Sequence, residues 1–158
     1  MSTYLLLKTL HVLSSVILAG TGFGSFFYLL CANRSRSVPA QAVVVRYVVL
    51  ADWMFTTPAG FIQPITGFMM MAMAGWSWTA PWIFWSLVLY VLAGACWLPV
   101  LWLQLQMRKM AEKAMKSETA LPEVYWRYAR RWELLGWPAF GSMVAIYFLM
   151  VGKPMFGQ

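Results

Sequence analysis

Two apolar stretches of the chain carry side chains that could do chemistry. Residues 8–24, KTLHVLSSVILAGTGFG, contain Lys8 and His11, the only histidine in the sequence. Residues 51–67, ADWMFTTPAGFIQPITG, contain Asp52 followed by a series of polar residues. Ionisable groups are costly inside a membrane and usually mark a functional site there. Both stretches are therefore candidate sites.

His11 is a candidate axial ligand for haem iron, because imidazole is a standard ligand in haem proteins. At helical spacing it shares a stripe with Ser15 and Gly22, which would let a flat macrocycle approach the backbone. Lys8 lies one turn away and could pair with a haem propionate. The sequence thus predicts a b-type haem at His11, Lys8, Ser15 and Gly22. The alternatives are that His11 forms a hydrogen bond to a neighbouring helix and that Lys8 extends to the head groups.

Residues of other segments can be placed at the depth of His11 by counting inward at about 1.5 Å per helical residue. This layer contains no second histidine, so one chain cannot form a bis-histidine haem. A methionine is the candidate sixth ligand, and five-coordinate iron is the alternative. The residues expected in the layer are Gln63, Thr66, Met69, Met70, Tyr90, Met143 and Tyr147.

Asp52 is the only acidic residue well inside an apolar segment. One interpretation pairs it with an arginine, either Arg46 or one of the cluster at 127–131. The other makes it a proton-relay or substrate carboxylate, in the half of the bilayer opposite His11. The expected members of this polar site are Asp52, Thr56, Thr57 and Gln63. Two prolines, Pro58 and Pro64, remove backbone donors, so neighbouring groups must satisfy the freed carbonyls.

The composition indicates an integral membrane protein. Of the 158 residues, 61% are hydrophobic and 11% charged, whereas soluble domains are roughly 25% charged. Four apolar segments each reach the ~20 residues that cross a bilayer. They predict an all-α fold, a four-transmembrane-helix antiparallel bundle that forms one domain over 1–158. The predicted helices span about 3–31, 42–74, 81–107 and 134–152, with a basic, amphipathic connection at 108–133.

The basic residues predict the orientation of this bundle. Ten of the 12 Lys and Arg residues flank the first loop or lie in the 108–133 connection, and only Lys8 and Lys153 lie towards the other side. The positive-inside rule places both connections in the cytoplasm and both termini on the outer, periplasmic side of a bacterial inner membrane. Because the basic residues lie beside membrane ends, the lipid bilayer is the expected partner and a nucleic acid is not.

Three stretches resemble the bacterial integral membrane proteins grouped as domain of unknown function 2269: YLLLKTLHVLSSVILAGTGFGSFFYL, ADWMFTTPAGFIQPITG and YWRYARRWELLGWPAFGSMVAIYFLMVGKP. The resemblance covers almost the whole chain and implies no activity. The first helix is also similar to those of copper-resistance D-like membrane proteins and of the HemJ-type protoporphyrinogen oxidase. In that enzyme a histidine in a K-x-L-H setting binds haem b, and His11 is the matching position. Unlike that enzyme, this chain has no lysine inside 42–74 or 81–107.

Two main functions of different classes are open at this point. The first is a small b-type haem protein with a role in redox chemistry or haem metabolism. The second is a cofactor-free accessory or scaffold subunit, which packs through Gly20, Gly22 and Gly24 as a homo-oligomer or in a larger membrane complex. A third is metal-ion transport, with methionines near the outer surface as soft ligands. The sequence contains no nucleotide-binding, zinc or nucleophile motif, and it assigns no enzymatic reaction.

Overall fold

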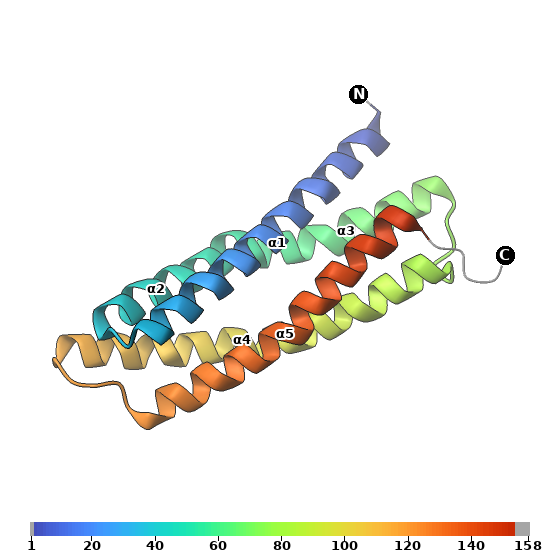
Figure 1. Cartoon of the computed structure of the whole chain (residues 1–158). Coiled ribbons are helices and arrows are strands. Elements are labelled where there is room, and N and C mark those ends of the chain that lie inside the picture. The colour runs from blue at the N-terminus through green and yellow to red at the C-terminus, as the bar shows by residue number, and fades with distance from the viewer. Residues whose placement is uncertain (1, 154–158) are drawn as a thin grey trace.

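The computed structural model describes residues 2–153, and all elements in that range are helices (Figure 1). They are α1 (Thr3–Ser35), α2 (Val38–Ala51), η1 (Asp52–Thr56), α3 (Thr57–Ala74), α4 (Pro81–Lys116) and α5 (Glu123–Gly152). Because η1 is a π-helical turn that joins α2 to α3, residues Val38–Ala74 form one continuous segment. Four helical segments are thus long and apolar enough to cross a membrane, which confirms the predicted fold class.

Short turns make consecutive segments antiparallel, and both termini lie at the same end of the bundle (Figure 1). The turn between α1 and α2 is only two residues long, and Arg36 adopts a left-handed conformation there with φ of 57°. Ser37 then accepts a hydrogen bond from the backbone N–H of Ala40 and so caps α2. Gly75 ends α3 with φ of 68°, a conformation that glycine adopts without strain.

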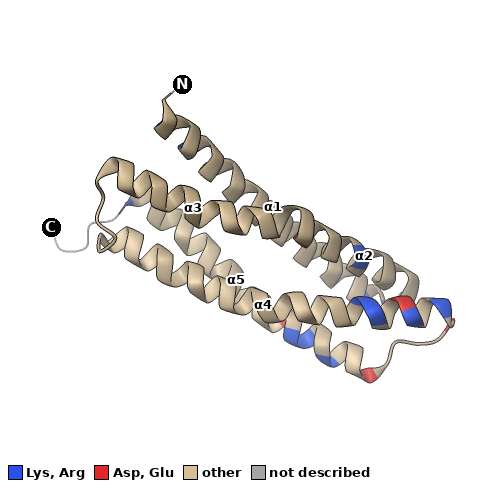
Figure 2. Cartoon of the chain, turned by 180° about the vertical axis from the view of Figure 1, so that it is seen from behind, with Lys and Arg blue, Asp and Glu red and all other residues tan. Residues whose placement is uncertain are grey.

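Charged residues gather at the end of the bundle opposite the termini (Figure 2). We call this the basic end; it carries the α1–α2 and α4–α5 turns, and the opposite end is the terminal end. The helices reach further into the basic end than the apolar segments predict, because α4 continues to Lys116 and α5 begins at Glu123. The 108–133 connection is therefore mostly helical, with a turn only at 117–122. The orientation of this end towards the cytoplasm stays a prediction.

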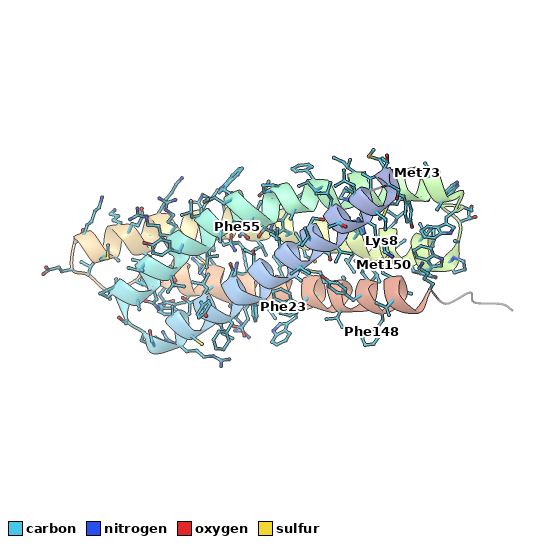
Figure 3. All side chains as sticks on the ribbon, turned by 90° about the horizontal axis from the view of Figure 1, so that it is seen from above. Lys8, Phe23, Phe55, Met73, Phe148 and Met150 are labelled. Atoms are coloured by element: carbon cyan, nitrogen blue, oxygen red, sulfur yellow. The ribbon has the colours of Figure 1, made fainter. Side chains whose placement is uncertain are left out.

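The largest buried cluster lies at the basic end, where all four segments pack together. Its most enclosed members are Leu29, Val45, Met107, Ala111 and Tyr125. Towards the terminal end the segments pack mainly in two pairs, α1 with α3 and α4 with α5, and α1 diverges from α5 (Figure 1). Apolar side chains such as Phe148, which is 76% exposed, point outward, as expected for a surface covered by lipid (Figure 3).

Candidate functional site

His11 joins α1 to α3 through both nitrogens of its ring. Nδ1 lies 2.9 Å from Oγ1 of Thr66, and Nε2 lies 3.0 Å from Nε2 of Gln63. Both partners belong to the layer that the sequence places at the depth of His11. Ser14, one turn further along α1, donates a hydrogen bond of 2.5 Å to Oε1 of Gln63. The four side chains form one polar network between two membrane-spanning helices.

The partners of His11 determine which of its nitrogens carries the proton. The Thr66 hydroxyl donates to the backbone carbonyl of Ile62 at 2.7 Å, so it accepts from Nδ1–H of His11. Nε2 is then unprotonated and accepts from the amide N–H of Gln63. The Gln63 oxygen is in turn satisfied by Ser14. The imidazole is therefore neutral, and each polar atom of the ring has a partner.

Gly67 allows the ring of His11 to approach the α3 backbone. A Cβ atom at this position would lie 3.2 Å from Cε1 of His11, closer than side chains normally pack. A side chain at 67 would require the ring to shift by a few tenths of an ångström. Gly67 thus accommodates the close approach of the His11 ring, a role that was not predicted from the sequence.

The other residues predicted to surround a haem face elsewhere. The Ser15 hydroxyl donates to the carbonyl of Val12 in its own helix, and its backbone carbonyl accepts from the Tyr147 hydroxyl of α5 at 2.9 Å. A Cβ on Gly22 would contact Phe140 of α5 at 3.5 Å. His11 therefore packs against α3, whereas Ser15 and Gly22 pack against α5.

Lys8 lies on α1 near the terminal end, and its side chain is exposed (Figure 3). Within residues 2–153 the structure has one ion pair, between Arg108 and Glu112 at 2.8 Å, so Lys8 has no described acidic partner. The residues around His11 do not fit a haem iron as they stand, because Gln63 holds the only unprotonated ring nitrogen.

Asp52 forms the second polar site, at the π turn η1. Its side chain is 3% exposed. The turn is widened, because the N–H of Thr57 bonds to the carbonyl of Asp52 five residues earlier. Pro58, which directly follows Thr57, has no N–H and so cannot donate the hydrogen bond to the carbonyl four residues earlier that an α-helix normally makes. Widened turns of this kind occur frequently at functional sites.

Several buried oxygens in and around Asp52 have no hydrogen-bond partner within residues 2–153. Thr56, in the same turn, and Gln104 of α4 are the side-chain neighbours of the carboxyl. Among the residues that the structure describes, Oδ2 of Asp52, Oγ1 of Thr56 and Oε1 of Gln104 are buried without a partner. Thr57 also has an unpartnered hydroxyl oxygen. Buried polar atoms are nearly always satisfied, so this cluster is exceptional.

Two expectations for Asp52 need correction. The arginine pairing is wrong within the described residues, since the single ion pair does not involve Asp52 and Arg46 is exposed. Gln63 does not join Asp52, because its amide is held by His11 and Ser14. Gln104 was missed, although it stands as a polar residue in the apolar run LWLQLQM and could have been considered for that reason.

Tyr90 of α4 contacts α3 at Gly60, which lies between Asp52 and Gln63 in the sequence. Its hydroxyl donates to the backbone carbonyl of Gly60. That carbonyl would normally accept from the residue four positions on, but this is Pro64, which has no N–H. The freed carbonyl is satisfied by a neighbouring helix, as the two prolines of this segment predict.

Four apolar helices that enclose a histidine network and a buried carboxyl define a multi-pass integral membrane protein. The chain belongs to the family of predicted integral membrane proteins named domain of unknown function 2269, whose sequence profile matches residues 5–154. No curated protein and no solved structure matches the chain.

Proposed function

We propose that this membrane protein takes up and releases a proton at Asp52 within the bilayer. The observation that carries the proposal is a carboxyl group 3% exposed, with orphaned oxygens beside it and no cation paired with it among residues 2–153. An ionised carboxylate in such surroundings is very costly. The resting site therefore holds the carboxyl in its protonated form.

The hydrogen-bonding capacity of the site supports this protonation state. An ionised carboxylate can only accept hydrogen bonds, and the same holds for the oxygen of Gln104, so neither can donate to the other. A proton on Oδ2 of Asp52 turns the carboxyl into a donor, which can bond to the Gln104 oxygen or to the Thr56 hydroxyl. One proton thus satisfies atoms that are otherwise without a partner.

The same neighbours also allow the proton to leave. When Asp52 loses it, the Thr56 hydroxyl can rotate to donate to the carboxylate, and the Gln104 amide can turn its NH₂ group towards the charge. Neither residue has a competing side-chain partner for those oxygens. A group that is acceptable in both protonation states has the property that a proton relay requires.

Infrared difference spectroscopy of the full chain in lipid tests this proposal. Titration from neutral to alkaline pH should remove the absorption band of a protonated carboxylic acid, and Asp52→Asn should lack that band from the start. Glu112→Gln, which changes a carboxyl on the helix surface, is the matched control and should retain it. An ionised Asp52 at neutral pH, seen as the absence of the band in the unsubstituted chain, would contradict the proposal.

A b-type haem at His11 is the second candidate function. The observation that favours it is the unprotonated Nε2 of the neutral His11 ring, which becomes available to iron when the rotatable Gln63 side chain turns away. The chain purified after growth with ample haem would then show a Soret band, which His11→Ala should abolish and Gln63→Leu should strengthen. If neither the unsubstituted chain nor either variant shows a Soret band, this candidate is excluded. If Asp52→Asn also leaves function unchanged, the cofactor-free accessory or scaffold role remains.

A further inference from the structure

A cavity of about 380 Å³ lies at the basic end, where α1 ends and α5 begins. Three arginines dominate its lining, against one glutamate. Two tryptophans supply its aromatic surface. The lining residues are Leu30, Asn33, Arg34, Arg36, Trp126, Ala129, Arg130, Trp132 and Glu133. The cavity lies at the basic end, which Figure 2 shows opposite the termini, and its lining includes no residue of the His11 network or of the Asp52 site.

The arginines of this cavity are not committed to other partners. The ion pair described above uses Arg108, so Arg34, Arg36 and Arg130 have no carboxylate partner in the described part of the chain. The guanidinium of Arg36 stacks on the ring of Trp126, 4.0 Å from its centroid. Stacking orients the planar guanidinium while leaving its N–H groups available at the edge. The geometry is suited to a planar array of anionic oxygens.

Two further donors face no protein acceptor. Trp132 is 3% exposed, and its indole N–H has no hydrogen-bond partner among residues 2–153. Asn33 accepts from the Tyr125 hydroxyl at 2.7 Å through its oxygen, which fixes the amide and leaves its NH₂ group for another acceptor. A buried orphan donor, a fixed amide and unpaired arginines thus belong to residues that line the same cavity.

We infer that this cavity binds the phosphate group of an anionic phospholipid. Guanidinium groups bind phosphate through paired hydrogen bonds, and basic pockets between membrane helices hold anionic lipid head groups. The flanking surface favours a lipid over free phosphate. One turn towards the bundle centre, Phe27, Leu134 and Trp137 are 59%, 63% and 61% exposed and form an apolar surface for acyl chains.

Native mass spectrometry of the full chain in a neutral detergent tests the inference, with phosphatidylglycerol as the probe. The variant Arg34→Gln/Arg36→Gln/Arg130→Gln should bind it about tenfold more weakly or worse, since each arginine near the surface contributes to the attraction. Lys109→Gln/Lys113→Gln removes basic residues from the same end, outside the cavity, and should bind like the unsubstituted chain. Equal losses in both variants would overturn a specific site.

Further binding measurements distinguish a lipid phosphate from free phosphate. Inorganic phosphate should displace the lipid only weakly, and phosphatidylcholine should bind less than phosphatidylglycerol. Displacement by inorganic phosphate at low concentration, or equal binding of the zwitterionic lipid, would contradict an anionic lipid as the ligand. Arg36→Lys keeps the charge and weakens the stacking on Trp126, so it should give an intermediate loss. Circular dichroism of each variant verifies that the helices are retained.

Discussion

The His11 network and the Asp52 site differ in how completely their polar atoms are satisfied. Both lie between membrane-spanning helices, and both use side chains of the same segment, Val38–Ala74. At His11 each ring nitrogen has a partner and the proton positions are consistent throughout. At Asp52, four oxygens have no partner among residues 2–153: Oδ2 of the carboxyl and the side-chain oxygens of Thr56, Thr57 and Gln104. The first arrangement holds two helices together, whereas the second leaves a group that can change its protonation state.

The largest effect on stability is expected from Gly67→Val. The new side chain would overlap the His11 ring, which lies 3.2 Å from the position of a Cβ. Displacing the ring breaks the network between α1 and α3, at a cost of about 3 kcal/mol. Denaturant unfolding in detergent measures the change. The matched control is Gly24→Val, because a Cβ there has no neighbour within 4 Å; equal losses would show that the His11 contact is unimportant.

His11→Ala is expected to cost less, about 2 kcal/mol, because it leaves the Gln63 amide and the Thr66 hydroxyl without their shared partner. The same unfolding measurement applies. Ser15→Ala is the comparison on the same helix, since its hydroxyl bonds only within α1. A His11→Ala variant as stable as Ser15→Ala would mean that the closed network does not hold the helices together.

Tyr90→Phe tests the hydrogen bond between α4 and the Gly60 carbonyl of α3 and should cost about 1 kcal/mol. It removes the hydroxyl that satisfies the carbonyl freed by Pro64, while the ring stays in place. Tyr28→Phe, at a residue 64% exposed, should leave the free energy of unfolding unchanged. If the two variants behave alike, the carbonyl of Gly60 must find another donor.

Asp52→Asn should change stability least, by about 0.5 kcal/mol or less. Asparagine keeps the shape of the protonated carboxyl and supplies N–H donors for the orphaned oxygens, so no buried atom loses a partner. Unfolding in detergent at neutral pH measures this. A loss of several kcal/mol would show that a buried negative charge is needed for folding, and it would remove the difference between the two sites.

Much of the architecture could be predicted from the sequence, because apolar runs of membrane length leave few alternatives. The helices of the basic end extend beyond those runs, since amphipathic stretches such as 123–133 continue the helix where the apolar pattern stops. Counting inward along the predicted helices places Gln63 and Thr66 at the depth of His11, and in the structure both side chains contact His11. Depth follows from the helical rise alone, which explains why it could be predicted.

The direction in which each side chain points could not be predicted in the same way. His11 and Gly22 share a stripe on α1, but the helix is long and meets α3 at one level and α5 at another. Arg46 precedes Asp52 by six residues, which at about 100° per residue places it on a different face. Gln104 comes from a separate segment, whose rotation relative to η1 is set by packing.

The π turn at Asp52 also determines the direction in which the side chains of α3 point. A widened turn contains one extra residue, which rotates the downstream helix by about 100° relative to an uninterrupted one. Gln63 and Thr66 meet His11 only in that rotated frame. Deleting a single residue such as Phe55 would restore ordinary winding and turn Gln63 and Thr66 away from His11. The one extra residue in the π turn therefore determines how the side chains of α3 are rotated relative to those of α2.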